Sequence, residues 1–173
     1  MLRTTIQAQE WENKMGCLVK REDLKTLLAD LKTQGKTVVT TNGCFDILHV
    51  GHVRYLQKTK TFADVMLVCL NSDSSVKSIK GPDRPINNEL DRAEILCALE
   101  CVDYVVMFEE SSPEKLLGEI KPDVHTKGAD YTIETLPEAK VIIENGGKVE
   151  FISFVEGKST TNVIKKIGAQ SNN

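Results

Sequence analysis

The sequence has few aromatic residues and no strong excess of either charge. Nine aromatic side chains among 173 residues leave little for the base-stacking surfaces of proteins that bind single-stranded nucleic acid. The net charge of −3 at pH 7 also differs from the basic footprint of nucleic-acid-binding proteins. No apolar stretch approaches the roughly 20 residues that span a bilayer. We therefore expect neither a nucleic acid nor a membrane among the partners of this chain.

The N-terminal residues lack the apolar core of a secretory signal, so we expect a cytoplasmic location. The cysteines agree with that expectation, because their number, five, is odd and no Cys-x-x-Cys pair occurs. Cys97 and Cys101 are four residues apart on an expected helix, and a metal site there is an open alternative. A structural zinc site needs four ligands, however, and no second pair is evident. We expect all five cysteines to be buried in the apolar core.

From residue 21 onward, helix-like segments alternate with strand-like segments. Four leucines between positions 24 and 31 recur at the three- to four-residue spacing of an amphipathic helix. Residues 65–71 form a nearly continuous apolar run, which is typical of a strand buried on both faces. Such patterns predict helices at residues 21–34, 50–63, 89–101, 113–120, 134–145 and 160–167. They predict strands at residues 37–42, 65–71, 104–108, 123–127 and 149–154.

Strands that are separated by helices of this length form parallel sheets covered on both faces. We therefore expect an α/β domain over residues 21–168, with a doubly wound, mostly parallel five-stranded sheet. Residues 1–20 fit no element and are expected to be an N-terminal extension, and residues 169–173 a C-terminal tail. In such sheets ligands bind beyond the carboxyl ends of the strands, where the strand order reverses.

Two common phosphate-binding motifs are absent. No Gly-x-Gly occurs, which excludes the dinucleotide-binding fingerprint. Residues 157–160 resemble the end of a P-loop, but the glycine that this motif requires five residues before Gly157 is replaced by Ile152.

The segment that follows the first central strand carries two of the three histidines, His49 and His52, with Gly51 between them. It joins a strand end to a helix start, where unpaired backbone N–H groups and the helix dipole favour an anion. Gly51 also removes the Cβ that would hinder close approach of a ligand. Two alternatives stay open: loop histidines without a task, or half of a metal site whose third ligand would be His125.

Asn42-Gly43-Cys44-Phe45-Asp46, followed by His49-Val50-Gly51-His52, resembles the cytidylyltransferase-like nucleotidyltransferases, whose signature is His-x-Gly-His. Further segments occur in the order expected of the heptose 1-phosphate adenylyltransferases within that family. They are Asn71-Ser72-Asp73, Lys80-Gly81-x-x-Arg84-Pro85, Ala98-Leu99-x-x-Val102-Asp103, Pro122-Asp123, Lys127-Gly128-x-Asp130-Tyr131, Asn145-Gly146-Gly147 and Ser159-Thr160-Thr161-Asn162. The resemblance covers about residues 20–168 and implies a Rossmann-like nucleotidyltransferase fold.

The resemblance implies transfer of AMP from ATP to D-glycero-β-D-manno-heptose 1-phosphate, which gives ADP-heptose and pyrophosphate for lipopolysaccharide core synthesis. It implies Mg²⁺ as a cofactor with ATP and no metal ion held by side chains alone. We also expect a homo-oligomer, with a dimer favoured, and a separate heptose kinase upstream. Two alternatives remain: a relative that uses glycerol 3-phosphate with CTP or phosphopantetheine with ATP, and a nucleotide-binding module without catalysis.

By the same resemblance, His49, His52 and Lys80 are expected to be catalytic. The histidines would donate hydrogen bonds to the triphosphate, and the lysine would neutralise the departing pyrophosphate. Residues expected to bind the nucleotide are Thr41, Asn42, Gly43, Cys44, Phe45, Gly51, Lys127, Gly128, Asp130, Ser159, Thr160 and Thr161. Residues expected to meet the second substrate, a phosphate or the adjoining loop are Asp46, Lys77, Arg84 and Arg92.

Several of these residues have simpler interpretations. The Ser159–Thr161 run is also a good helix N-cap, the two lysines could be solvated charges, and Asp130 could cap a turn. We assign His125 to packing. Lys80 lies in a segment, residues 78–85, that is rich in glycine and proline, and we expect a mobile loop there that closes over the triphosphate.

Overall fold

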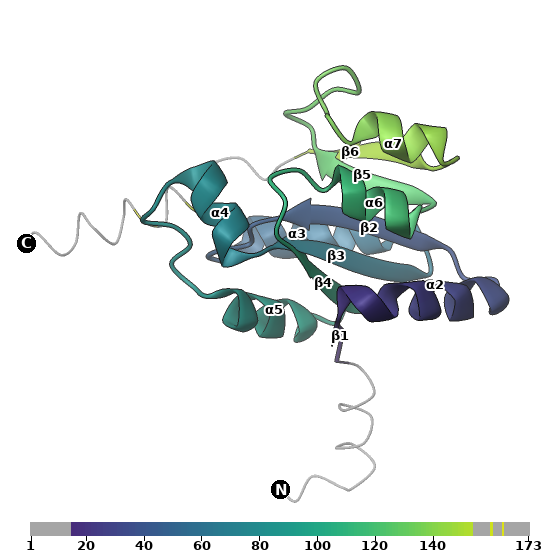
Figure 1. The fold of residues 1–173 in the computed structure, drawn as a ribbon, viewed down its shortest axis with the longest axis horizontal. Coiled ribbons are helices and arrows are strands. Elements are labelled where there is room, and N and C mark those ends of the chain that lie inside the picture. Colours follow the sequence, from purple (N-terminus) through teal and green to yellow (C-terminus); the bar gives the residue numbers. More distant parts are fainter. Residues whose placement is uncertain (1–14, 154–159, 161–163, 165–173) are drawn as a thin grey trace, which may run out of the picture.

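The computed structural model describes residues 15–153, 160 and 164, and this part of the chain contains one six-stranded sheet (Figure 1). All strand pairs are parallel, and the strand order is β1-β4-β3-β2-β5-β6. The strands are β1 (Cys17–Val19), β2 (Val38–Gly43), β3 (Val65–Asn71), β4 (Tyr104–Phe108), β5 (Val124–Gly128) and β6 (Lys148–Ile152). The helices are η1 (Arg21–Asp23), α2 (Leu24–Thr33), α3 (Val50–Lys60), α4 (Asp73–Lys80), α5 (Glu89–Cys97), α6 (Glu114–Ile120) and α7 (Ala139–Glu144).

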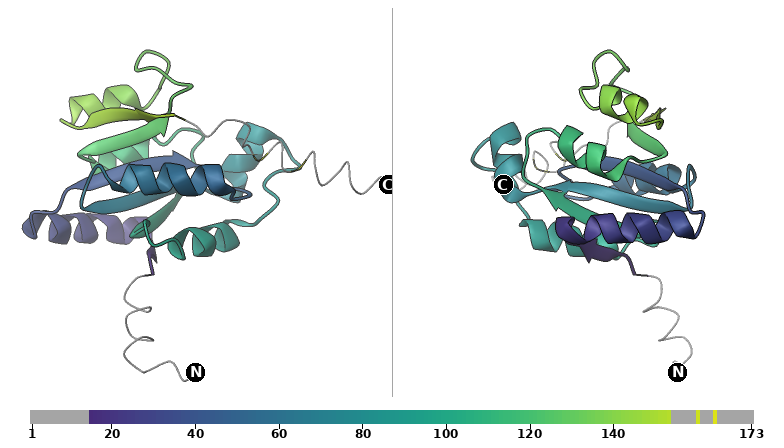
Figure 2. Two further views of the ribbon diagram at one scale, coloured as in Figure 1. Left: turned by 180° about the vertical axis from the view of Figure 1, so that it is seen from behind. Right: turned by 45° about the vertical axis from the view of Figure 1, so that its right-hand side comes forward.

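Strand β3 is buried along its whole length, as its apolar run predicts. Successive side chains of a strand point to opposite faces of the sheet. Val65, Leu67 and Cys69 therefore pack in one core with α2, α6 and α7, and the residues between them pack in a second core with α3 and α5. Figure 2, in which the molecule is also seen from behind, shows these two helix layers on opposite faces of the sheet. The predicted α/β class with a doubly wound parallel sheet is confirmed.

The strand order reverses between β2 and β5. From β2 the chain moves outward through β3 to β4, and α6 then carries it back to β5 and β6 on the other side of β2. The carboxyl ends of β2 and β5, at Gly43 and Gly128, flank this reversal. A crevice at such a position is where open α/β sheets bind ligands.

The structure contains two elements that the sequence did not predict, a strand at the edge of the sheet and a helix after β3. The expectation of five strands is wrong because Cys17–Val19, in the stretch expected to form no element, pairs with β4 as a short edge strand. Residues 73–80 form α4 where no helix was predicted, because Ser72 caps the helix by accepting a hydrogen bond from the backbone N–H of Ser75. The other strands begin and end within two residues of the predicted bounds.

Helices α3, α5 and α7 are each at least three residues shorter than predicted, and α3 ends at Lys60. Helix α5 ends at Cys97 because the chain turns toward β4, with the N–H of Val102 bonded to the carbonyl of Leu99. Cys97 and Cys101 therefore do not share a helix face. The predicted helix 134–145 is reduced to α7, since residues 132–135 form a turn and Pro137 cannot donate a helical hydrogen bond. The predicted helix 160–167 lies almost entirely outside the described residues.

The prediction that all five cysteines are buried is wrong. Cys69 and Cys97 are buried, but Cys44 and Cys101 are half-buried and Cys17 is exposed. Cys17 lies on an edge strand that has one neighbour, so part of its surface is left uncovered. Among the described residues, no helix is long and apolar enough to cross a membrane.

Candidate active site

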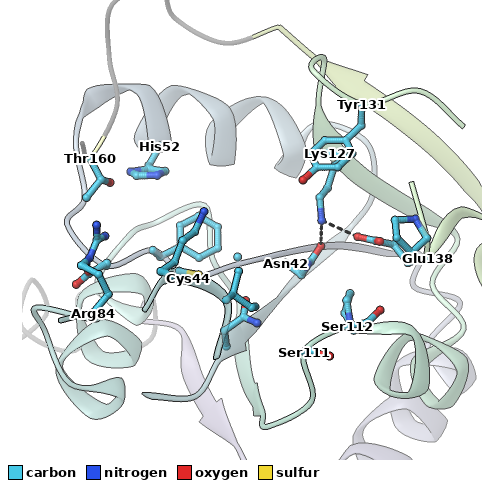
Figure 3. A pocket seen from close by; sticks show the side chains of 18 of the residues that line it. Asn42, Cys44, His52, Arg84, Ser111, Ser112, Lys127, Tyr131, Glu138 and Thr160 are labelled. Carbon is cyan, nitrogen blue, oxygen red and sulfur yellow. Dashed lines mark hydrogen bonds and ion pairs between the residues drawn. The ribbon is translucent and has the colours of Figure 1, made fainter. Parts of the chain in front are cut away.

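A cavity of about 610 Å³ opens beyond the carboxyl ends of β2 and β5. Figure 3 shows His52, Thr160 and Arg84 at one end and Lys127, Tyr131 and Glu138 at the other. Predicted site residues that line the cavity are Asn42, Gly43, Cys44, Phe45, Asp46, His52, Lys80, Arg84, Lys127 and Thr160. The structure thus brings together residues from four separate segments of the sequence.

The two histidines are fixed by the first turn of α3. His49 is the N-cap residue, and its Nδ1 accepts the backbone N–H of Gly51 at 3.1 Å. Nδ1 of His52 accepts the backbone N–H of His49 at 3.4 Å, and the two rings stack with 4.0 Å between their centroids. Because Nδ1 is an acceptor in both rings, the proton of each neutral imidazole lies on Nε2. The His52 ring, which lines the cavity, can then donate one hydrogen bond through Nε2.

The surroundings of His52 keep its ring neutral. Burial lowers the pKa of His52 to about 4, and the neighbouring His49 adds to this effect. The edge of the Phe45 ring packs on His52 with 5.5 Å between centroids. Phe45 itself has φ of 44°, a left-handed conformation that is strained for a bulky residue. A Cβ at Gly43 would lie 3.0 Å from the Phe45 ring, so any larger residue there would force this ring to shift.

Asp46 connects the loop after β2 to the segment before α5. Its buried carboxylate accepts the backbone N–H groups of Ile86, at 2.8 Å, and Asn87, at 3.0 Å, and pairs with the guanidinium of Arg84. Burial alone would raise the pKa of Asp46, but the bonds from Asn87, Ile86 and Arg84 lower it below its usual value. Residues 84–87 are therefore held in place, and the loop that we expected to be mobile is attached to the cavity wall.

Arg92 is fully buried and does not line the cavity. Its guanidinium donates to the carbonyls of Asn87, Cys44 and Asn71 and to the carboxylate of Asp73. Of the two roles predicted for it, the loop contact is the one that the structure shows, and a substrate contact is not seen. Four of its five N–H groups are used in joining these loops.

Lys77 and Lys80 lie in the last turn of α4 and not in a loop. Lys80 lines the cavity, whereas Lys77 does not. Lys80 makes no ion pair within the described part of the chain. Lysine is favourable at this helix end because the macrodipole is negative there. The two lysines thus differ in position although both are exposed.

Lys127 lines the cavity, as predicted, and its ammonium group makes two contacts that the sequence did not predict. Its Nζ lies 2.7 Å from Oδ1 of Asn42 and 2.6 Å from Oε1 of Glu138, as Figure 3 shows. Burial alone would raise the pKa of Glu138, but His125 and Lys127 lower it to about 2. Other lining residues that sequence reasoning missed are Asn71, Ser111, Ser112, Tyr131 and Glu138. Asn71, Ser111 and Ser112 lie at or just after the carboxyl ends of β3 and β4, which was the available signal, whereas Glu138 lies next to α7.

Other residues predicted to bind the nucleotide do not line the cavity. Thr41 is buried in β2, and its hydroxyl bonds to Tyr55. Gly51 and Gly128 are buried, and Asp130 is exposed in the turn after β5. Ser159 and Thr161 lie outside the described residues. The Thr160 hydroxyl donates to the carbonyl of Ile47 at 3.2 Å.

The cavity suits a phosphorylated ligand. Lys80, Arg84 and Lys127 supply positive charge, and His52 adds a neutral N–H donor at a helix N-terminus. Burial raises the pKa of the Cys44 thiol, so this residue is protonated at neutral pH and is not an activated nucleophile. Among the described residues, no three carboxylate, histidine or cysteine side chains cluster as a metal site.

A doubly wound parallel sheet with such a site defines an α/β nucleotidyltransferase. The chain belongs to the cytidylyltransferase-like family, whose model matches residues 40–166. An enzyme of this class uses a nucleotide as co-substrate, and the predicted resemblance to this family is confirmed.

Most of the chain is similar in sequence to known proteins. It is 48% identical over 160 residues to the bifunctional protein HldE of Syntrophotalea carbinolica, covering 92% of this chain and 32% of the relative. It is 55% identical over 136 residues to the bifunctional protein HldE of Geotalea uraniireducens, and this match covers 79% of this chain and 28% of the relative. The chain thus spans about a third of the length of these relatives. The crystal structure of a lipopolysaccharide core biosynthesis protein from Thermoplasma volcanium matches with a TM-score of 0.59 and 29% identity, over 72% of this chain and all of that one.

Proposed function

We propose that this chain transfers AMP from ATP to the phosphate of D-glycero-β-D-manno-heptose 1-phosphate, giving ADP-heptose and pyrophosphate. The observation that carries the proposal is the identity of 48% and 55% to proteins named HldE over most of the chain. HldE is the bifunctional ADP-heptose synthase whose adenylyltransferase motifs the sequence resembles. The name of the structural neighbour, a lipopolysaccharide core biosynthesis protein, agrees with this product.

In this reaction an oxygen of the sugar phosphate attacks the α-phosphorus of ATP, and the bond from the α-phosphorus to the bridging oxygen breaks. Pyrophosphate leaves with the electron pair, so no covalent enzyme intermediate is needed. The protein's contribution is to position the reactants and stabilise the developing charge. His49 and His52 would donate through Nε2 to phosphate oxygens, and Lys80 and Arg84 would neutralise the pyrophosphate. The geometry supporting these roles is His52 at the start of α3, which lines the cavity together with Lys80 and Arg84, and the His49 ring stacked on it.

Mg²⁺ would enter with ATP, bound to the phosphate oxygens and therefore part of the substrate. We further propose that the transferase domain comprises residues 21–168, acts in the cytoplasm and forms a homo-oligomer, with a dimer favoured. Its sugar phosphate would come from a heptose kinase. Sedimentation of the purified chain tests the oligomer directly: a single monomeric species at micromolar concentration would overturn it.

Pyrophosphate release tests the proposal. The chain is mixed with MgATP and, separately, heptose 1-phosphate, glycerol 3-phosphate or phosphopantetheine, and CTP replaces ATP in a parallel series. We expect release with ATP and the heptose phosphate, and none when the sugar phosphate is omitted. Release with CTP and glycerol 3-phosphate, or with phosphopantetheine, would assign one of the alternative substrates. Failure of every pair, with ATP still bound, would favour a binding module.

A further inference from the structure

Four side chains share one face of the two strands at which the strand order reverses. Thr40 and Asn42 are two residues apart on β2, and His125 and Lys127 are two residues apart on β5. Since side chains alternate along a strand, each pair points to one face of the sheet. Thr40 lies opposite His125 in the parallel register, and Asn42 and Lys127 lie one step nearer the cavity. The four residues form a polar path from the core to the cavity.

Glu138, just before α7, contacts this path from the side. Its side chain is only 3% exposed, and its Oε1 lies 2.6 Å from Nζ of Lys127 and 3.7 Å from Nε2 of His125. A buried carboxylate that loses its cation is strongly destabilising. Among the described residues, Lys127 is the lysine or arginine within ion-pair distance of Glu138. Lys127 and Glu138 therefore depend on each other.

The ammonium group of Lys127 has three N–H donors. Asn42 accepts from it at 2.7 Å and Glu138 at 2.6 Å, so two of the three donors are assigned. The Tyr131 ring lies 5.3 Å from Nζ and limits the space on another side. The third donor has no acceptor in the part of the chain that the structure describes, and Lys127 lines the cavity. Asn42 and Glu138 thus fix the direction in which this donor is presented.

Across the residues that the structure describes, His125 has a ring nitrogen without a hydrogen-bond partner close to the Glu138 carboxylate. Its Nδ1 lies 2.8 Å from Oγ1 of Thr40, and its fully buried Nε2 has no hydrogen-bond partner among the described residues. When the Thr40 hydroxyl donates to Nδ1, the imidazole proton lies on Nε2, on the side of the Glu138 carboxylate. The separation of 3.7 Å is too long for a hydrogen bond. A small shift of the carboxylate toward the ring would complete one.

We propose that Glu138 is a positioning residue: with Asn42 it aims the third N–H of Lys127 at a phosphate oxygen of the bound nucleotide, and His125 receives the carboxylate when Lys127 shifts toward that phosphate. The inference rests on the proposed function for the identity of the ligand. It assigns a task to a buried histidine and a buried glutamate that the proposed chemistry does not otherwise use.

A double-variant cycle tests this inference by calorimetric binding of MgATP, which needs no second substrate. Glu138→Gln, which keeps the shape of the side chain and removes its charge, should weaken binding about tenfold. Lys127→Met should weaken binding by at least as much, and adding Glu138→Gln to it should cause no further loss, since a positioning residue acts through its partner. Glu144→Gln, at the exposed last residue of α7, is the matched control and should bind as wild type does.

Unfolding of the same proteins without ligand gives an independent result. Lys127→Met should lower the melting temperature strongly or prevent folding, because Glu138 is then left buried and unpaired, and Glu138→Gln should restore part of the loss. Equal weakening of MgATP binding by Glu138→Gln in both backgrounds, or unchanged binding by Lys127→Met, would overturn the inference. Neither result depends on pyrophosphate release, so an inactive wild-type chain would reject the proposed function alone.

Discussion

At the residue scale, the proposed reaction depends on His49 and His52 as hydrogen-bond donors to phosphate oxygens. Replacing His52 with alanine removes one such donor, and we expect kcat to fall about 10²- to 10³-fold, the range for loss of an oxyanion-stabilising donor. His49 needs a finer variant because its Nδ1 also caps α3. His49→Asn keeps a good cap and removes the imidazole. Steady-state kinetics should show the same loss of kcat for His49→Asn as for His49→Ala. A wild-type kcat in the asparagine variant would show that His49 acts only as the N-cap of α3.

The low pKa of His52 has a consequence for stability. Burial holds the pKa at about 4 in the folded protein, against 6.5 as the ordinary value. Between these two values an unfolded chain binds a proton at His52 that the folded protein does not, so stability falls as the pH falls through this window. We expect the melting temperature of wild type to drop more steeply from pH 7 to pH 4.5 than that of His52→Asn. Parallel curves for the two proteins would show that His52 titrates normally.

At the element scale, the position of α4 determines which of its two lysines lies at the cavity. Lys80 lines the cavity and Lys77 does not, although both lie in the last turn of this helix. Lys80→Ala should therefore lower kcat/KM strongly and leave binding of AMP, which lacks the β- and γ-phosphates, almost unchanged. Lys77→Ala is the matched control and should behave as wild type. If Lys80→Ala weakened AMP binding as much as turnover, Lys80 would contact the nucleoside part of ATP and not its β- and γ-phosphates.

Asp46 holds the segment between α4 and α5 in place. Its side chain is 1% exposed and pairs with Arg84, so Asp46→Asn removes one partner of a buried ion pair. We expect a loss of about 3 kcal/mol in the free energy of unfolding, measured with a chemical denaturant. Asp83→Asn, an exposed neighbour in the same segment, should cost little. Similar stability of the two variants would show that the Asp46 contacts add nothing to the fold.

At the scale of the whole molecule, the hydrophobic pattern of the sequence predicted the central strands of the sheet better than its edge strand β1. The apolar run at residues 65–71 is typical of a strand buried on both faces, and the structure confirms this prediction. Strand β1 has three residues, too few for any pattern, and it exists because β4 offers an open edge. Helix α4 depends on a serine cap and on contacts with β3, and its eight residues are too short for a clear periodic signal.

The site was predictable where its residues are local in sequence and not where they meet through the fold. The His49–His52 segment combines a strand end, a helix start and two histidines within a few positions, so sequence reasoning finds it. Glu138 meets Lys127 only because the fold brings the residue before α7 to the end of β5, and nothing in the residues around position 138 indicates this. For Arg92 the sequence left a phosphate contact and a loop contact open, because a sequence does not show that its donors are bound to the carbonyls of Cys44 and Asn71.

The fate of the phosphates of ATP tests the central claim most directly. Two reactions are run with heptose 1-phosphate and MgATP, one with the label on the α-phosphate and one with it on the γ-phosphate, and the products are separated by chromatography. The account predicts that the α label appears in ADP-heptose and that the γ label appears only in pyrophosphate. Transfer of the γ label to the sugar, or an α label that stays in ATP while the protein binds both substrates, would contradict it.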